Sequence, residues 1–584
     1  MKANKITVCG GGSCRSQKSD SIFKNLKKEV KAAKLDVTVE HTGCHGMCEV
    51  GPLVVVGQNK KEILYTKVTA EDAKDIVNSA KKGTILKRLI FEHEEDGHQA
   101  YVEDIDFYKY QTRYVMRRTG QIDPYKIKHY LGTGGFEGLK LALVMKPEEV
   151  IAMVKESNLR GRGGAGFNTG MKWSFIAREE GERILIANAD EGDPGSFMDR
   201  TLMEGDPFAV IEGMTIAAWA VGSEKAHIYV RAEYPDSIKT LTNAINEAKK
   251  EGFLGKNICG IKGFNFDIEI FEGAGAFICG EETALISSLE GKRGMPRPKP
   301  PFPAQNGVYG KPTNINNVKT YAYVSHILRE GPESFKQYGT EKSPGTAVLC
   351  LTGKIKHTGV VEVPMGISLH DIVYKIGGGI RNNKKLKAVL TGGPSGGCIP
   401  ADKIKEVTVD YESITAAGSI MGSGGMLILD EDDNMVEIAN FFVEFTKSES
   451  CGKCTPCREG TYRMYELLQK ISKHKAKQED LDNLKVLAKY IQENSLCGLG
   501  QSAPNPVLTT IKHFGNEYDD KIKNKKPTYF ITESCTGCGL CAKKCPVQCI
   551  SGKIKQQHTI DQSKCIHCGI CYKVCPTKAI IIEK

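Results

Sequence analysis

Cysteines, and the way they are grouped, constrain this chain more than any other feature of its sequence. The 584 residues include 21 cysteines, most of which fall into four compact sets. The N-terminus MKANKITVCG lacks the apolar core of a signal peptide, and the longest apolar runs fall short of the ~18 residues of a membrane span. We therefore expect a cytoplasmic protein with no membrane partner, in which clustered thiols bind metal rather than form disulfides.

The two sets nearest the C-terminus share one spacing. CTGCGLCAKKCP and CIHCGICYKVCP both read C-x2-C-x2-C-x3-C-P, the spacing of bacterial ferredoxins with two [4Fe-4S] clusters, in which each fourth cysteine serves the other cluster. Two zinc sites are the alternative, but zinc gives no role to the third close cysteine or the proline. The expected ligands are Cys535, Cys538, Cys541 and Cys575 for one cluster, and Cys565, Cys568, Cys571 and Cys545 for the other.

A third set combines CGKCTPC with one distant cysteine. The amphipathic stretch EDLDNLKVLAKYIQE separates them and predicts a helix. Three thiolates lie on one turn, and the helices would bring the fourth, distant thiolate back to them. This arrangement indicates a [4Fe-4S] cluster in a helical bundle, with zinc as the alternative on spacing alone. The expected ligands are Cys451, Cys454, Cys457 and Cys497.

The fourth set opens the chain. The strand-like runs KITV and DVTVEHT precede CGGGSC and CHGMC, with a charged helical segment between them, which predicts a thioredoxin-like βαβ start. These spacings match neither zinc fingers nor a CxxC redox pair, so a [2Fe-2S] cluster fits better. Its expected ligands are Cys9, Cys14, Cys44 and Cys48. The remaining thiols are expected to be packed and buried: Cys259, Cys279, Cys350, Cys398 and Cys549.

The run GRGGAGF, Gly161 to Phe167, matches the dinucleotide fingerprint G-x-G-x-x-G. That fingerprint has structural meaning only where a buried strand leads into the glycines. Here KPEEVIAMVKESNLR comes first, with apolar residues at helical spacing and acids in the first turn, and it predicts a helix. The helix argues against a Rossmann turn, and on the residues alone a purely structural turn is the default, although the amides of the loop and two arginines, Arg160 and Arg162, still suit phosphate.

The cluster-free middle of the chain is where a two-electron site is expected, because four clusters imply single-electron transfer and flavin is the usual converter. This region resembles the NADH-binding FMN subunit of respiratory complex I and its relatives in soluble hydrogenases and formate dehydrogenases. The resemblance covers roughly residues 105 to 515. It rests on GRGGAGFNTGMKW, NADEGDPGSFMDR, GAGAFICGEETALISSLEGKRGMPRPKPPFP and NINNVKT, followed by the CGKCTPC and SLCGLG runs.

The resemblance implies which residues surround FMN. The loop from Gly161 to Gly170 would be shared between NADH and the flavin phosphate, whose charge Lys172 would neutralise. Asn188, Asp190 and Glu191 would hydrogen-bond the ribityl chain and ring edges. The implied set for FMN and NAD(H) is Gly161, Arg162, Gly163, Gly164, Gly166, Phe167, Lys172, Asn188, Asp190, Glu191, Phe277, Gly280, Glu281, Glu282, Asn316 and Asn317.

On the nucleotide side, the resemblance places Glu281 and Glu282 beside the nicotinamide and ribose, and Asn316 and Asn317 at the flavin phosphate region. Glu191 and Glu281 are the implied catalytic residues. Acids near the nucleotide should repel a 2′-phosphate, which favours NADH over NADPH. By composition alone, each acid could equally be solvated surface.

The chain as a whole is expected to be an α/β multidomain protein. Strands and glycine turns after Thr352 predict a β-grasp domain, and the polar, lysine-rich run before the last module predicts a linker. The expected organisation is a thioredoxin-like [2Fe-2S] domain (1–85), an FMN/NADH-binding domain (105–340), a β-grasp domain (345–430), a helical bundle with [4Fe-4S] (433–515), a linker (516–528) and a ferredoxin domain with two [4Fe-4S] clusters (529–584).

This combination of modules resembles the β subunit of NAD-dependent, electron-bifurcating [FeFe] hydrogenases. The resemblance implies hydride exchange between FMN and NAD(H), and electron exchange with soluble ferredoxin. It also implies a hetero-oligomer with a catalytic hydrogenase-type subunit and a small thioredoxin-like [2Fe-2S] subunit. The alternatives are the same subunit in a formate dehydrogenase or an NADH/NADPH transhydrogenase, and a non-catalytic electron-transfer scaffold. The net charge of +10 comes from scattered lysines, so no nucleic-acid partner is expected.

Overall fold

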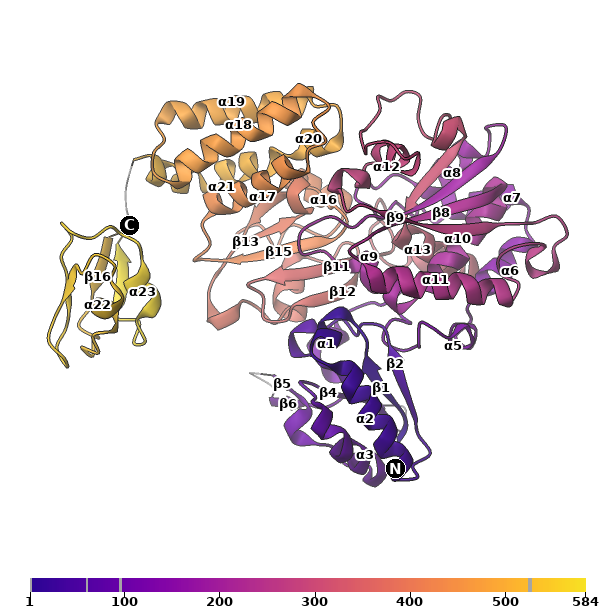
Figure 1. Cartoon of the computed structure of the whole chain (residues 1–584), viewed down its shortest axis with the longest axis horizontal. Coiled ribbons are helices and arrows are strands. Elements are labelled where there is room, and N and C mark those ends of the chain that lie inside the picture. The colour runs from indigo at the N-terminus through magenta and orange to yellow at the C-terminus, as the bar shows by residue number, and fades with distance from the viewer. Residues whose placement is uncertain (1–2, 59–60, 94–96, 524–527, 584) are drawn as a thin grey trace.

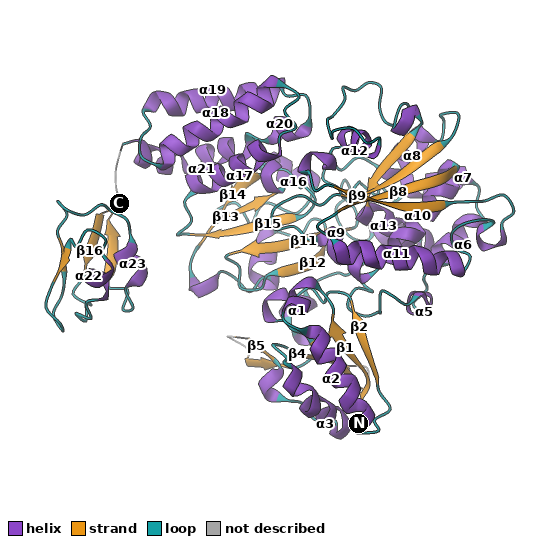
Figure 2. Ribbon diagram, viewed as in Figure 1, coloured by secondary structure: helices purple, strands orange, loops and turns teal. Residues whose placement is uncertain are grey.

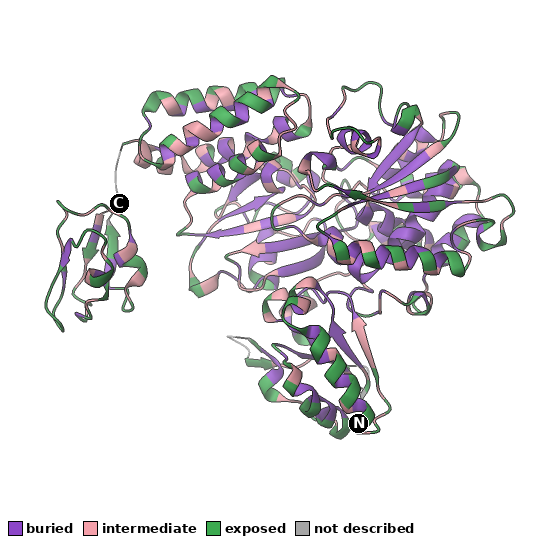
Figure 3. Cartoon of the chain, in the orientation of Figure 1, coloured by how far each residue is buried: buried purple, intermediate pink, exposed green. Residues whose placement is uncertain are grey.

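The computed structural model of the chain describes residues 3–58, 61–93, 97–523 and 528–583. Figure 1 shows the N-terminal module below a large central body, a layer of helices above it, and the C-terminal module standing apart at the left. Figure 3 shows the strands of the central body buried, whereas the long helices of the upper layer expose one side. Among the described residues, no helix combines the length and apolar character needed to cross a membrane.

The N-terminal module is a four-stranded sheet in the order β2-β1-β3-β4. Its strands are β1 (Ala3–Cys9), β2 (Thr38–Thr42), β3 (Val54–Gln58) and β4 (Lys61–Tyr65). β1 pairs in parallel with β2 and antiparallel with β3. The helices α1 (Gly12–Ser16), α2 (Ser19–Ala32) and α3 (Ala73–Lys82) belong to it, and α2 and α3 bury apolar faces in the same core. The predicted thioredoxin-like βαβ start is confirmed.

The central body contains an all-parallel sheet in the order β10-β7-β8-β9. Its strands are β7 (Arg183–Ala189), β8 (Ser223–Arg231), β9 (Asp267–Gly273) and β10 (Thr313–Asn317). Helices α10 (Pro207–Val221) and α13 (Val318–Glu330) pack against each other in the largest core. Helix α12 (Glu282–Leu289) buries its apolar side in a second core, together with residues of β7 and β10. RILIANAD is therefore the buried parallel strand that its sequence predicts.

Helices surround this sheet, including α7 (Pro147–Glu156), which precedes the glycine loop as predicted. The others are α5 (Ile127–Leu131), α6 (Glu137–Leu143), α8 (Thr169–Ile176), α9 (Met198–Gly205), α11 (Pro235–Lys250) and α14 (Pro332–Lys336). The short helix α4 (Asp106–Lys109) precedes them, and its Phe107 packs in a separate core. A small hairpin of β5 (Phe91–His93) and β6 (Gly97–Gln99) precedes them.

A second sheet follows, mixed in direction, in the order β12-β11-β15-β13-β14. It is formed by β11 (Thr346–Gly353), β12 (Gly359–Pro364), β13 (Leu386–Thr391), β14 (Gly397–Pro400) and β15 (Gly425–Asp430). The first and last strands, β11 and β15, pair in parallel at its centre. This is the predicted β-grasp arrangement. The β11-β12 hairpin is followed by the helical segment α15 (Leu369–Asp371) with η8 (Ile372–Ile376), and strands β13 to β15 then return to the sheet. Helix α16 (Tyr411–Ala416) extends toward the central body.

The upper layer is a bundle of α17 (Met435–Glu449), α18 (Thr455–Ser472), α19 (Gln478–Asn494), α20 (Gly498–Ser502) and α21 (Asn505–Ile522). Helix α19 is the predicted amphipathic stretch. Helix α21 runs to Ile522, so the first part of the segment expected as a linker, 516–522, is helical, and residues 524–527 lie outside the described residues.

The C-terminal module contains two small antiparallel sheets, β16-β19 and β17-β18, and two short helices, seen in Figure 2. They are β16 (Thr528–Ile531), α22 (Leu540–Lys544), β17 (Ile550–Ser551), β18 (Thr559–Ile560), α23 (Ile570–Val574) and β19 (Ile580–Glu583). One expectation about the unclustered thiols is wrong: Cys259 is exposed, in a turn where its own φ is +50°. Cys279, Cys350, Cys398 and Cys549 are buried as predicted.

Candidate functional site

Polar residues gather at the carboxyl ends of the parallel strands, where ligands bind in open α/β sheets. Asn188 at the end of β7 pairs in register with Asn317 at the end of β10. The Asn188 side chain donates to the carbonyl of Gly280, 3.0 Å away, in the loop before α12. Gly163 of the glycine loop lies against Asn317, because a Cβ built on this glycine would be 3.2 Å from the Asn317 Cβ. Segments far apart in sequence therefore meet at one edge of the sheet.

The glycine loop forms a tight turn that leaves several amides without protein partners. Its ends are closed by the Gly161 N–H, which donates to the Phe167 carbonyl at 2.8 Å. Gly164 and Gly166 adopt φ values of +123° and +65°, which favour glycine. Among the described residues, the amides from Gly163 to Gly166 have no hydrogen-bond partner. Successive unpaired amides of this kind suit an anion such as a phosphate.

The two arginines of the loop brace it from within the protein. Arg160 forms an ion pair with Glu412 at 2.5 Å and lies 4.0 Å over the ring of Tyr411. Arg162 is buried, and its guanidinium donates to the Pro344 carbonyl at 2.9 Å. Both side chains thus hold protein groups, and the phosphate-binding capacity of the loop resides in its backbone.

Tyr411 of the β-grasp domain is a contact that sequence reasoning missed. Its hydroxyl donates to the Gly161 carbonyl at 2.8 Å, and its ring fills the space where a side chain at Gly166 would lie. The β-grasp domain therefore supports the glycine loop directly. No local sequence signal marks this residue, since the contact joins two domains.

Asp190, just beyond β7, carries an unsatisfied buried carboxylate. Neither of its carboxylate oxygens has a hydrogen-bond partner among the described residues. Burial raises the pKa of Asp190 to about 7, and Glu233 adds to this effect while Arg231 opposes it. Buried polar atoms are normally paired, so these oxygens are available to a ligand that donates hydrogen bonds.

Glu191, in contrast, is fully engaged by the protein. Its two carboxylate oxygens accept hydrogen bonds from the backbone N–H groups of Asp199 (3.0 Å) and Arg200 (3.1 Å), in the first turn of α9. Burial raises the pKa of Glu191 to about 7, with a further contribution from the Asp199 carboxylate. Glu191 thus anchors the start of α9 beside the site, and its implied catalytic role stays a prediction.

Glu281 and Glu282 occupy the N-terminus of α12. Glu281 is the N-cap, accepting from the backbone N–H of Thr283 at 2.9 Å. Glu282 lies between Lys172 (3.0 Å) and Lys299 (2.8 Å). Despite its burial, these two ammonium groups lower the pKa of Glu282 to about 2, so the carboxylate is ionised at neutral pH. The predicted residues Lys172 and Glu282 therefore meet as an ion pair.

Asn316 and Asn317 lie at the base of the site. Asn316 accepts a hydrogen bond from the indole N–H of Trp173 at 3.0 Å and is buried. Asn317 caps α13 and donates to Asp199 at 2.7 Å. Asp199 also forms a buried ion pair with Lys319, a residue that the sequence did not single out. This pair joins the starts of α9 and α13.

Phe277 connects the site to the helical bundle. Its backbone N–H donates to Glu449 of α17 at 2.9 Å, and its ring meets that of Phe445 with 5.2 Å between centroids. The cysteines of the third set pack into the same apolar cluster as Phe277: Cys451, Cys454, Cys457 and Cys497. The third cysteine set therefore lies directly beyond the loop that borders the strand ends.

The first cysteine set lies on another side of the site, against α9. Cys9, Cys14 and Cys44 are buried, and the Sγ atoms of Cys44 and Cys48 are 4.0 Å apart. The neighbouring Gly43 leaves no room for a Cβ because the backbone of Gly205, the last residue of α9, lies there. Since Glu191 holds the other end of α9, one short helix joins this cysteine set to the strand ends.

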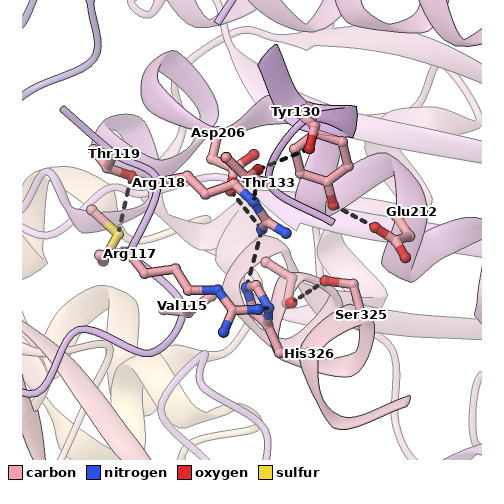
Figure 4. A network of polar contacts seen from close by, with 12 residues as sticks. Val115, Arg117, Arg118, Thr119, Tyr130, Thr133, Asp206, Glu212, Ser325 and His326 are labelled. Carbon is pink, nitrogen blue, oxygen red and sulfur yellow. Dashed lines mark hydrogen bonds and ion pairs between the residues drawn. The ribbon is translucent and has the colours of Figure 1, made fainter. Parts of the chain in front are cut away.

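A buried polar network fixes the junction between α9 and α10 (Figure 4). Arg118 forms an ion pair with Asp206 at 3.3 Å and lies 4.4 Å over the ring of Tyr130. Tyr130 in turn donates to Glu212 of α10 at 2.5 Å. His326 of α13 contacts Arg118 through Nε2, and its pKa is held well below the usual value by burial and by the nearby arginines. The network keeps α9 in place beside the first cysteine set.

In the described parts of the chain, the cysteine side chains are not gathered around one metal-ion position. No group of three His, Cys, Asp or Glu side chains in the described parts of the chain converges closely enough for one metal ion. The two remaining sets lie in the C-terminal module, where five of their thiols line one small core with Tyr529 and Ile580: Cys541, Cys545, Cys565, Cys571 and Cys575. Cys538 and Cys568 are exposed. The spacing of each set, rather than a tetrahedral arrangement, is what indicates iron–sulfur ligation.

Comparison with known proteins identifies the family. The profile of the Nuo51 FMN-binding domain matches residues 154–326, and that of the NADH-ubiquinone oxidoreductase-F iron-sulfur binding region matches 437–521. The thioredoxin-like [2Fe-2S] ferredoxin profile matches 1–81, and the 4Fe-4S dicluster domain profile matches 519–579. The NADP-reducing hydrogenase subunit HndC of Solidesulfovibrio fructosivorans is 52% identical over 461 residues, which are 77% of this chain and 94% of the relative. The chain belongs to the family of NADH-dehydrogenase-type FMN subunits.

Further relatives support this membership. An NADH-quinone oxidoreductase subunit of Rhizobium meliloti is 46% identical over 414 residues, which are 70% of this chain and 98% of the relative. A solved structure, the NAD+-reducing [NiFe]-hydrogenase in the H2-reduced state, superposes with a TM-score of 0.63 at 29% identity, covering 88% of this chain and 84% of that chain. This member of the family therefore carries [2Fe-2S] and [4Fe-4S] modules, and the predicted fold class is confirmed.

Proposed function

We propose that the chain is the NAD(H)-oxidoreductase subunit of a cytoplasmic, electron-bifurcating hydrogenase complex. The observation that carries this proposal is the placement of the strand-end site. A cradle of unpaired amides and an unsatisfied acid lies between two cysteine sets, one beyond Phe277 and one beyond α9. Such a site can pass single electrons to nearby clusters in two directions.

Bound FMN would supply the conversion between a hydride and two single electrons. The chain's own residues bind and orient it. The amides from Gly163 to Gly166 and the Lys172 ammonium provide the positive groups for its phosphate. Asp190 would accept hydrogen bonds from the flavin. Asn188, Asn316 and Asn317 would line the polar base of the site. Glu191 and Glu281 hold the first turns of α9 and α12 in position around the site.

The nucleotide is proposed to be NAD(H). Glu281 and Glu282 stand at the N-terminus of α12, and Glu282 is ionised at neutral pH because two lysines stabilise its charge. Lys172 and Lys299 pair with these acids and offset their charge, so the proposed preference for NADH rests on the family resemblance and not on a net negative charge. The name of the relative HndC specifies NADP, so the nucleotide is the first property to measure: KM for NADH should be lower than that for NADPH.

One [2Fe-2S] and three [4Fe-4S] clusters are proposed to form the electron path. Electrons leave through the Cys451 cluster, and the C-terminal module exchanges them with a soluble ferredoxin. The partners are a catalytic hydrogenase-type subunit and a small thioredoxin-like [2Fe-2S] subunit. The support is that all the required modules occur in one chain and that relatives carry hydrogenase names.

Metal and flavin analysis of anaerobically purified protein tests the cofactor set. The assignment requires about 14 iron atoms and one FMN per chain. Zinc in place of iron, or absence of flavin, would contradict it. Affinity purification from the native cell then tests the partner, since a formate dehydrogenase or a transhydrogenase subunit in place of a hydrogenase would overturn that part of the proposal.

A further inference from the structure

The two halves of the C-terminal module repeat each other in detail. In the first half the Gly537 N–H lies 3.4 Å from the Cys535 Sγ, and in the second the His567 N–H lies 3.3 Å from the Cys565 Sγ. The residues that precede α22 and α23 are both glycines with a φ of +71°. The backbone therefore has the same conformation in both halves at two places, after the first cysteine of the run and before the helix.

The side chains of the two halves differ at several positions, and at one of them a thiol is present in only one half. Cys549 follows the first run in CPVQC, and Ala579 occupies the matching place in CPTKA. The Cys549 carbonyl accepts from the Asp561 N–H at 2.7 Å, and the Ala579 carbonyl accepts from the Thr532 N–H at 2.8 Å. Both residues are buried. The two positions are therefore structurally equivalent, and a thiol is present at only one of them.

The Cys549 thiol lies against ligands of a single predicted cluster. Its Sγ is 3.4 Å from that of Cys545, and Cys565 is its second thiol neighbour. Cys545 is the ligand that crosses from the first run to the second, and Cys565 is the first ligand of the second run. These three sulfurs therefore meet where the second cluster is expected.

We propose that Cys549 is not a ligand, and that its thiol donates a hydrogen bond to a ligand sulfur of the second cluster, which raises the reduction potential of that cluster. A buried free cysteine acts as a small apolar group with a weak S–H donor. Reduction adds negative charge to the cluster and its sulfurs, so a donor next to them stabilises the reduced form. Ala579, at the matching position, has no such donor, and the ligand that crosses to the first cluster, Cys575, lies instead 3.6 Å from the Thr577 hydroxyl.

The thiol thus acts on one cluster of the module, the one held by Cys545, Cys565, Cys568 and Cys571. The inference rests on the two [4Fe-4S] clusters of the proposed function, but it concerns the potential of one of them and not the identity of any partner.

The experiment is an EPR-monitored redox titration of the full-length, cluster-loaded protein, comparing wild type with Cys549→Ala and Ala579→Cys. Cys549→Ala places in the first half the side chain that the second half already has, so the change is sterically mild. We expect it to lower the midpoint of one of the two clusters of the module, to leave the other midpoint unchanged, and to keep the iron content. Ala579→Cys should raise the midpoint of the first cluster.

Two results would overturn the inference. Unchanged midpoints in Cys549→Ala would show that the thiol donates nothing to the cluster. Loss of about four irons in that variant would show that Cys549 is a ligand. Failure of the proposed function is recognised separately, because wild-type protein would then lack the two-cluster signals of this module before any substitution is made.

Discussion

The substitution Asp190→Asn tests whether the unsatisfied acid at the strand ends binds the flavin. Burial raises the pKa of Asp190 to about 7, Glu233 and Glu449 add to the shift, and Arg231 opposes it. A flavin that donates hydrogen bonds to the carboxylate prefers its ionised form. Apparent affinity should therefore follow the ionised fraction, which rises with pH through 7 and increases about tenfold between pH 6 and pH 8.

The assay is a fluorescence titration of the flavin-free protein with riboflavin, because the phosphate of FMN itself titrates near pH 6. Wild type should bind up to about tenfold more tightly at pH 8 than at pH 6. Asp190→Asn should show a flat profile, and at pH 8 it should lose about 1.5–3 kcal/mol, or about 10- to 150-fold in affinity, the value of hydrogen bonds to a charged group.

Asp193→Asn is the matched control. Asp193 is also buried and its pKa is raised to about 6, but its carboxylate already accepts a hydrogen bond from Ser423 at 2.9 Å. This variant should keep the wild-type slope around pH 7. If Asp190→Asn keeps the slope as well, another group such as Glu191 titrates with binding, and the reasoning about Asp190 is refuted.

Three further substitutions probe the support of the site and its clusters. Tyr411→Phe removes the hydroxyl that holds the glycine loop and should weaken FMN binding by about 0.5–1.5 kcal/mol, whereas Tyr374→Phe on the same domain should not; equal affinities would contradict the clamp. Lys319→Met leaves Asp199 buried without its cation and should cost about 3–5 kcal/mol of stability, measured by denaturant melts; an unchanged midpoint would contradict the pair. Cys14→Ser should remove about two irons per chain while FMN is retained, and full iron content would exclude it as a ligand.

Cofactor type was predictable because cysteine spacing is a local property of the sequence. The ferredoxin runs and the thioredoxin-like start needed no knowledge of tertiary contacts. The sequence also predicts that a helix, and not a strand, precedes the glycine loop, because the apolar residues there have helical spacing. Helix α7 lies at this place. The polar sequence around Tyr518 predicts that the linker begins there, but helix α21 continues through it. The ring of Tyr518 is buried in the core of the bundle and holds this part of α21 in place.

The orientation of individual side chains could not be predicted. Composition cannot tell an acid that faces a ligand, such as Asp190, from one that caps a helix, such as Glu191, although they are adjacent. The difference depends on where α9 begins, which is fixed by tertiary packing. Tyr411 and Lys319 were missed for the same reason, since their partners are distant in sequence.

Anaerobic titration of the purified chain with NADH, followed by absorption and EPR spectroscopy, tests the central claim most directly. The account predicts that NADH bleaches the bound flavin and that cluster signals of reduced iron–sulfur centres then appear. Protein that binds FMN and carries its full iron, yet shows no flavin bleaching with excess NADH, would contradict the claim and leave the chain an electron-transfer scaffold.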